Sequence, residues 1–444
     1  YSIYINLNKK ILTNSYQVFI YFFTIFACIS SIFNILIITN NYNYFRLILT
    51  LIITAELIFV LRNYSLLKLK IIDIFKFENK KYLILIIFFI FYLISILPIS
   101  DADSIALHQN LPNEIFLKGL DNINFDKNLS FSIFSNAHSL LIISPSLNSD
   151  NFGAQLNILT LILFFFLNYK KKFNFYLILL SCPLIIYFVS VQKLSLFFGI
   201  LYLLIFIQIN EKRIQNKLDL FLVIFLLAFY SSGNLSYILF SIPLIIYVFV
   251  QQKHRWKQLI SYSILSFLII LFPLFLVKQI YFSNILAPFL DNFLGQNNFL
   301  YNAYSYSIRS TDGWLADPSN YKLYLVPFIP YNIGSLTTSL GIIFLIMFLN
   351  LSLCKKTKFF PIMIIGLVLF TGQIVPRYYL EAFLILSYYY LPKYLFTKII
   401  MSSTDNNIQS NFPDTAMHIA CRKGNIKNGY SISSRFCMGI CMTP

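Results

Sequence analysis

The chain has 444 residues, of which 58% are hydrophobic and 11% are charged, and its formal net charge is +17. Soluble domains carry about 25% charged residues, so this composition excludes an ordinary soluble protein and predicts a polytopic membrane protein. The mean hydropathy of +0.71 agrees with this interpretation. The six cysteines have neither the spacing of a disulfide framework nor the paired spacing of a zinc site.

Long apolar runs predict about twelve membrane helices. The expected fold class is therefore an all-α polytopic membrane protein, with a transmembrane domain over residues 1–400. Residues 401–444 form a polar tail, which we expect to be disordered or atypical. The predicted helices span residues 18–38, 44–61, 82–99, 152–168, 173–190, 194–209, 218–231, 235–250, 259–277, 335–353, 359–375 and 378–397.

The Lys and Arg residues are distributed unequally between the two sides of these predicted helices. Most of the 34 fall in the loops of one side, including the triple lysine at 170–172. The positive-inside rule makes that side cytoplasmic, with both termini inside. We therefore expect a multi-pass protein of a bacterial inner (plasma) membrane, in contact with membrane lipids and without a nucleic-acid partner. The outer side keeps Arg46, Lys118, Lys127, Lys193, Lys278, Arg309, Lys322 and Arg377.

Two long outer loops are predicted, at about 100–151 and 278–331. The first opens with Asp101 and Asp103, where an apolar helix leaves the bilayer. Two carboxylates at such a boundary can attract a cation or a proton. The alternative is that they cap the helix beginning near Ile105, because Asp near a helix start accepts backbone N–H bonds.

The first outer loop contains two further apolar stretches. Residues 104–118 predict a short amphipathic helix lying on the membrane. Residues 131–143 are too short to span, so we expect them to be interfacial or re-entrant. The apolar anchors expected in the first stretch are Ile105, Leu107, Leu111, Ile115 and Phe116.

Later parts of the chain add polar candidates. Arg309 and Trp314 lie in the second outer loop, where mixed polar and aromatic residues suit carbohydrate; the alternative is an aromatic belt. Arg377 and Glu381 are four residues apart on one helical face, so Arg377 either pairs with Glu381 or binds an anion. Glu56 stands alone in an apolar run and is either functional or a hydrogen-bonded structural residue.

This pattern resembles the multi-spanning glycosyltransferases of the GT-C fold class, which take a sugar from a polyprenyl-phosphate carrier. The resemblance depends on Asp101-Ala102-Asp103 at a helix exit, on the short helix expected after it, and on Pro376-Arg377-Tyr378 entering the last helix. The arrangement of helices and loops resembles the family over most of residues 80–395, but the matching motifs comprise only about ten residues.

The resemblance implies a role for each of these positions. Asp101 or Asp103 would be the general base that deprotonates an acceptor hydroxyl, and the other would orient the acceptor or a divalent cation, Mg²⁺ or Mn²⁺. Arg377 would bind the carrier phosphate. His108, where many relatives have a Tyr-His pair, would bind the acceptor. The implied partners are a lipid-linked sugar donor and a glycan or lipid acceptor, with Arg309, Trp314 and Glu381 as further binding candidates.

Two other functions stay open at this point. An O-antigen polymerase or ligase is also many-spanning with large outer loops, and would depend on outer arginines. A secondary transporter predicts inverted repeats and charges near the membrane midplane. The position of the acidic residues separates the classes, because a transferase needs them at the outer face.

Overall fold

The computed structural model describes residues 15–62, 80–99, 101, 104–123, 133–168, 173–211, 213–287, 339–341, 343–344, 347, 361, 363–366 and 376–389. Contacts divide the chain into two units, Tyr1–Leu391 and Pro392–Pro444. All the described residues belong to the first unit. This unit is all-helical, with no strand among the described residues.

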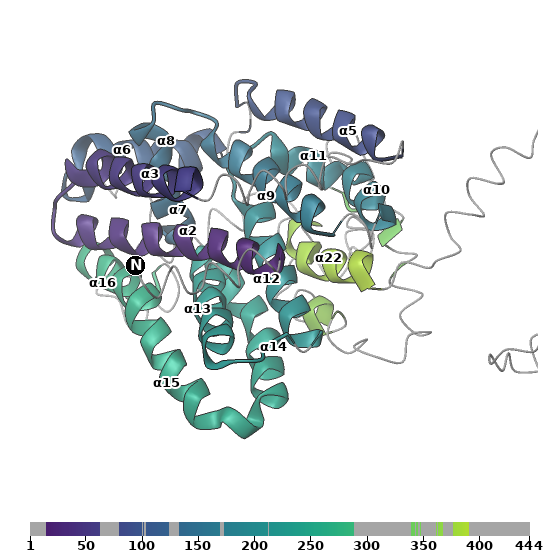
Figure 1. The fold of residues 1–444 in the computed structure, drawn as a ribbon. Helices are drawn as coiled ribbons and strands as arrows, with labels where there is room; N and C mark the ends of the chain where they lie inside the picture. The colour runs from purple at the N-terminus through teal and green to yellow at the C-terminus, as the bar shows by residue number, and fades with distance from the viewer. Residues whose placement is uncertain are drawn as a thin grey trace, which may run out of the picture. The chain divides into compact units, whose positions relative to one another are not determined.

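The regular elements are α-helices joined by short turns, with a few 3₁₀ and π turns (Figure 1). The first group is α2 (Ser15–Ile38), α3 (Tyr44–Arg62), α5 (Lys80–Ser95), the π-helix η1 (Ser104–Gln109), α6 (Asn110–Lys118), η2 (Leu120–Asn122), α7 (Asn136–Leu141) and α8 (Ile143–Ser146). The second group is α9 (Phe152–Asn168), α10 (Phe173–Ser181), α11 (Pro183–Val189), α12 (Ser195–Asn210), α13 (Lys217–Gly233), α14 (Leu235–Gln251), η4 (Lys253–Arg255), α15 (Trp256–Ser266), the π-helix η5 (Phe267–Leu271), α16 (Phe272–Phe282), η8 (Pro376–Tyr379) and α22 (Leu380–Tyr389).

Every apolar run predicted between residues 18 and 277 is helical, but three of them differ from the prediction in detail. The run 173–190 is divided at Cys182, which is extended, and a new helix starts with Pro183 at its first position. The helix over 82–99 ends at Ser95, because Pro98 disfavours helical backbone before it. The run 259–277 contains a π turn and continues to Phe282.

Two helices organise the described part of the bundle. Helix α12 is buried around its whole circumference from Leu196 to Ile209, as expected for a helix that is hydrophobic on all sides. It packs against α9, α13 and α22. Helix α2 runs between α3 and α16 (Figure 1) and also contacts α7 and α13. These two helices hold the elements that carry the candidate site.

Several helices present large apolar side chains to the outside of the protein. Leu51 on α3, Phe89 on α5 and Val250 on α14 are each about 60% exposed. Two helical stretches, Val18–Ile38 and Lys253–Phe282, are long and apolar enough to cross a membrane by length and composition. Only 28% of the most apolar window of Lys253–Phe282 is buried in the protein, against 56% for Val18–Ile38. Apolar surface this extensive is unusual on a soluble monomer.

Several charged residues make contacts that connect one loop with another. Arg46, predicted outside, donates to Asn148 Oδ1 at 3.2 Å, and Lys193, also predicted outside, contacts Asp101. From the predicted inner side, Arg255 donates to the Gln215 carbonyl at 3.2 Å. Each of these three contacts joins residues that the sequence predicts on the same side.

The first outer segment is helical as predicted, but it docks on protein. Leu107, Leu111 and Ile115 are buried, so the expectation that they anchor a helix in lipid is wrong. Of the five anchors expected there, Ile105 is the one that is 47% exposed. Helix α7 is buried from end to end between α2, α6 and α13, so the short stretch 131–143 does enter the bundle.

Candidate functional site

The carboxylate of Asp101 is the centre of a polar cluster just before η1. Its Oδ2 accepts hydrogen bonds from the Ser104 backbone N–H at 2.9 Å and from Ser104 Oγ at 2.8 Å. Its Oδ1 accepts from the Tyr187 hydroxyl at 3.0 Å. Lys193 Nζ lies 3.4 Å from Oδ2 and also donates to the Tyr187 hydroxyl at 3.1 Å. Asp101 thus caps η1 and forms an ion pair at the same time.

The pKa of Asp101 is set by opposing effects. Burial alone raises it, but the charge of Lys193 and the hydrogen bonds from Ser104 and Tyr187 outweigh burial and lower it below the usual 3.8. The carboxylate is therefore ionised at neutral pH. The Asp101 side chain is 21% exposed and the Lys193 side chain 6%, so the pair is partly shielded and reachable from one side.

The loop that carries Lys193 is fixed by side-chain amides. Asn157 Nδ2 donates to the carbonyls of Phe188 at 2.8 Å and Lys193 at 2.7 Å. Gln192 accepts from the Gly153 N–H and donates to the Asp150 carbonyl. Gly153 is required here because a Cβ at this position would collide with the Gln192 backbone. This loop therefore holds Lys193 at a defined place beside Asp101.

Two histidines stack beside this cluster. The rings of His108 and His138 are 5.1 Å apart between centroids and tilted by 3°. Ser135 Oγ donates to the Gly233 carbonyl at 2.9 Å and is 2.9 Å from His138 Nδ1. Because the hydroxyl proton is used on Gly233, the imidazole carries its proton on Nδ1 and presents Nε2 as an acceptor. His138 Nε2 has no hydrogen-bond partner among the described residues.

His138 is uncharged at neutral pH. Burial, and then the positive charge of Lys278, lower its pKa to about 3. A neutral imidazole can accept or donate a hydrogen bond but adds no charge. The cations near α7 and η1 are therefore lysines, with Lys193 on one side and Lys278 on the other.

A separate amide network fixes α7 in the bundle. Asn34 Nδ2 donates to Asn136 Oδ1 at 2.6 Å, and Asn136 Nδ2 donates to Ser232 Oγ at 2.6 Å. Ser139 Oγ donates to Asn34 Oδ1 at 2.5 Å. These four side chains are buried and join α2, α7 and α13. They place His138 under η1.

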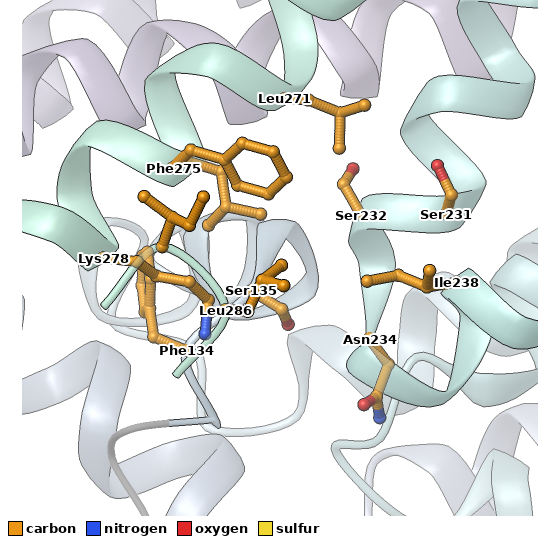
Figure 2. A pocket seen from close by; sticks show the side chains of 12 residues that line it. Phe134, Ser135, Ser231, Ser232, Asn234, Ile238, Leu271, Phe275, Lys278 and Leu286 are labelled. Atoms are coloured by element: carbon orange, nitrogen blue, oxygen red, sulfur yellow. The ribbon is translucent and has the colours of Figure 1, made fainter. Parts of the chain in front are cut away.

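A small pocket of about 20 Å³ lies between α7, α13, α14 and α16, which is room for one water-sized group. Figure 2 shows Lys278 on one wall and the end of α13, with Ser231 and Asn234, on the other. Lys278 is 1% exposed, and its Nζ donates to the Ala287 carbonyl at 2.6 Å. The pocket thus combines a buried lysine with hydroxyl, amide and apolar residues.

The structure brings some predicted site residues together and leaves others undescribed. Asp101 and His108 belong to one segment that packs on α7. Glu381 is buried and accepts a hydrogen bond from the Tyr230 hydroxyl at 2.8 Å. Glu56 accepts one from the Tyr21 hydroxyl at 2.7 Å. Asp103, Arg309, Trp314 and the side chain of Arg377 lie outside the described residues.

Sequence reasoning missed the closest partners of Asp101. Lys193 and Tyr187 are 92 and 86 residues away in the chain, and neither stands in a motif. One signal was available, because Lys193 is an isolated cation between two apolar runs on the predicted outer side. His138 was also missed, because it stands in a short apolar stretch and belongs to no motif.

The described donors around Asp101 do not suit a divalent cation. The Lys193 ammonium is 3.4 Å from Oδ2, and Ser104 and Tyr187 donate protons to the same carboxylate. A metal ion would meet a positive charge and three donors where it needs oxygen acceptors. No group of three or more metal-ligating side chains occurs among the described residues. We therefore derive no step through a metal.

Comparison of the chain with models of protein families, with curated proteins and with solved structures finds no match.

Proposed function

We propose that this protein is a polytopic membrane glycosyltransferase. It moves a sugar from a polyprenyl-phosphate carrier to a glycan or lipid acceptor on the outer face of a bacterial inner membrane. The observation that carries the proposal is the partly exposed Asp101 carboxylate, paired with Lys193 at 3.4 Å and lying beside the segment of His108. It supplies a proton acceptor and a cation in one place, at the predicted outer end of the helices.

The membrane location is supported by the surface of the helices. Helices α3, α5, α14 and α15 expose large apolar side chains, which a bilayer would cover. The pairing of Arg46 and Lys193 with other predicted outer residues supports the two-sided arrangement. Both observations support a bundle of helices of alternating direction, and in the proposed topology Asp101 lies on the outer side.

In the proposed reaction, an acceptor hydroxyl attacks the anomeric carbon of the donor sugar. The C–O bond to the carrier phosphate breaks, and the phosphate leaves with the bonding electron pair. Asp101 takes the hydroxyl proton, while His108 orients the acceptor. A cation close to the departing phosphate lowers the barrier because negative charge develops there.

Lys193 couples the base to the leaving group. A carboxylate with a lowered pKa is a weak base, and Lys193 is the main charge that lowers it. An anionic phosphate that attracts the Lys193 ammonium weakens its hold on Asp101. The carboxylate then recovers a more ordinary pKa as the substrate binds. In this scheme Asp101 becomes a better base when the donor is in place.

The proposal is tested by transfer from a polyprenyl-phosphate sugar in isolated membranes. Asp101→Asn and Asp103→Asn should each lower transfer about 100-fold or more, the usual contribution of a general base. Glu114→Gln is the matched control, because Glu114 is a carboxylate of the same segment that pairs with Lys118 at 2.7 Å. Full activity in both aspartate variants, with normal membrane insertion, would refute the mechanism.

A topology measurement tests the same proposal independently. An alkaline phosphatase fused after Asn122 should be active in a bacterial host, because that residue is predicted outside. A fusion after Asn216 should be inactive. The opposite pattern would put Asp101 in the cytoplasm and remove the outer active site.

One observation favours a second candidate, a secondary transporter. Glu381 is 1% exposed and lies within a predicted membrane helix, where carboxylates often bind transported ions or protons. Proton-driven uptake into vesicles that is lost in Glu381→Gln and kept in Asp101→Asn would support this function. The reverse result, with uptake absent and transfer present, would support the glycosyltransferase.

A further inference from the structure

The pocket beside Lys278 has the chemistry of an oxyanion site. The Lys278 side chain lines it, with Nζ donating to the Ala287 carbonyl at 2.6 Å, and no acidic residue is among the described residues that line it. His138, which hydrogen-bonds to the lining residue Ser135, is neutral and therefore does not compete with the lysine for an anion. Asn234 lies across the pocket from Lys278 (Figure 2). Charge-assisted hydrogen bonds from such groups favour phosphate or carboxylate oxygens.

The mouth of the pocket is apolar and open to the outside of the protein. Ile238 on α14 and Ile285 after α16 line it, and they are 37% and 38% exposed. They are continuous with the exposed apolar faces of the same region, such as Ile242 and Ile280. A ligand that enters here meets apolar surface first and the cation at the end. That order fits an amphiphile whose headgroup points inward.

The size of the pocket limits what enters it. Its volume of about 20 Å³ accommodates one water-sized group. One oxygen of a phosphate can occupy this volume next to Lys278, while the rest of the headgroup stays at the mouth near Asn234. A free sugar ring is too large for the enclosed part.

We propose that this pocket binds the phosphate of a membrane lipid, with Lys278 as the cation and the lipid chain lying along α14 and α16. Arg377, which the family resemblance implies for the carrier phosphate, is not among the described residues that line this pocket. Identifying the lipid as the sugar carrier rests on the proposed function. Binding of a lipid phosphate does not.

The experiment measures binding to the purified full chain in detergent. The probes are a fluorescent polyprenyl phosphate, the matching polyprenol without phosphate, and inorganic phosphate. The wild type should bind the polyprenyl phosphate about tenfold or more tightly than the polyprenol, because a charge-assisted hydrogen bond is worth at least that factor. Lys278→Gln should abolish this difference. Lys118→Gln, which changes an exposed outer lysine, should keep it.

A second pair of variants leaves the buried lysine in place. Ile238→Trp enlarges an exposed side chain at the mouth and should weaken binding of the polyprenyl phosphate about tenfold by blocking entry. Leu51→Trp is its control, because Leu51 lies on α3, is 60% exposed and does not line the pocket. Equal binding by both tryptophan variants would overturn the proposed route.

Three results would overturn the inference. These are unchanged binding in Lys278→Gln, equal affinity of the wild type for polyprenol, and inorganic phosphate that binds as tightly as the lipid, which would indicate a site for free anions. Failure of the proposed function gives a different pattern. Lipid binding would then depend on Lys278, while no sugar transfer occurred in the wild type. Conversely, transfer that is lost in Asp101→Asn and unaffected in Lys278→Gln would support the function and show that the lipid bound at this site is not the sugar carrier.

Discussion

Two polar clusters lie next to each other in this bundle and are built differently. The Asn136 network is neutral and buried, and its amide and hydroxyl groups bond to one another across α2, α7 and α13. The Asp101 cluster is charged and partly exposed, and its ion pair joins the segment just before η1 to the loop before α12. The first fixes a short helix in place. The second keeps a carboxylate within reach of a ligand.

This difference indicates a structural role for the Asn136 network and a chemical role for the Asp101 cluster. Neutral groups that satisfy each other inside a protein specify one packing arrangement without the large desolvation cost of an ion. A partly exposed ion pair contributes less to stability but can exchange its partner when a ligand arrives. We therefore expect changes in the Asn136 network to act on folding, and changes in the Asp101 cluster to act on activity.

The largest effect on stability is expected for Asn136→Leu. This change leaves Asn34 Nδ2 without its partner and removes one of the two hydrogen bonds of Ser232 Oγ, which keeps the one to the Phe229 carbonyl. Each buried group left unsatisfied costs about 1–3 kcal/mol. The free energy of unfolding, measured by titration into sodium dodecyl sulfate, should fall by about 3 kcal/mol. Asn122→Ala, which removes one exposed hydrogen bond to the Lys118 carbonyl, should change it by less than about 1 kcal/mol.

The activity of Asn136→Leu tests whether the Asn136 network acts only on folding. Transfer per folded molecule should stay within a few-fold of the wild type, because Asn136 contacts no residue of the Asp101 cluster in the described structure. A loss of transfer larger than the loss of folded protein would show that the network also belongs to the reaction site.

The next effect in size is expected for Lys193→Met. Removing the cation should lower the free energy of unfolding by about 2 kcal/mol, because Asp101 keeps its other donors and is partly exposed. Transfer should fall further, by about 100-fold, since the leaving phosphate loses its cation. Lys193→Arg should recover part of the transfer. Lys118→Met serves as the exposed control.

Tyr187→Phe should have a smaller effect on the free energy of unfolding than Lys193→Met. It removes one hydrogen bond to the Asp101 carboxylate and one from Lys193, which together are worth about 1–2 kcal/mol of unfolding free energy. Tyr247→Phe, at the predicted inner end, removes a hydrogen bond to Asn210 and should leave transfer unchanged. If both variants lose transfer equally, Tyr187 has no special role.

Between residues 18 and 277, sequence reasoning located the helices well and the contacts poorly. A run such as 194–209 is recognisable because α12 is apolar around its whole circumference, and this property is local. The break at Cys182 was also readable, since Pro183 disfavours helical backbone in the residue before it. The apolar face of residues 104–118 was recognised, but its pattern does not distinguish lipid from a protein surface as the covering partner.

Of the candidate site, the sequence indicated Asp101 and His108, which belong to one segment, but not their distant partners. Asp101 is marked by its position after an apolar helix, but its partners depend on how distant segments pack. The contact between Asp101 and Lys193 exists because α9, α11 and α12 bring the loop around Gln192 back to η1. No local pattern encodes this path. His138 and Lys278 were missed because each is a single polar residue in or beside an apolar run.

The smallest predicted effect is a pH dependence of stability that comes from Asp101. Its pKa is lower in the folded protein than the usual 3.8, so its contribution to stability is complete above the unfolded value. The contribution is lost as the pH falls from about 4 through the folded pKa. Thermal unfolding in detergent between pH 6 and pH 2.5 should therefore show a loss of stability that is smaller in Asp101→Asn. Asn136→Leu, which removes no titrating group, should lower stability equally at every pH. If Asp101→Asn and the wild type instead lose stability in parallel, the ion pair with Lys193 is too well screened to hold the carboxylate, and the coupling of base and leaving group loses its physical basis.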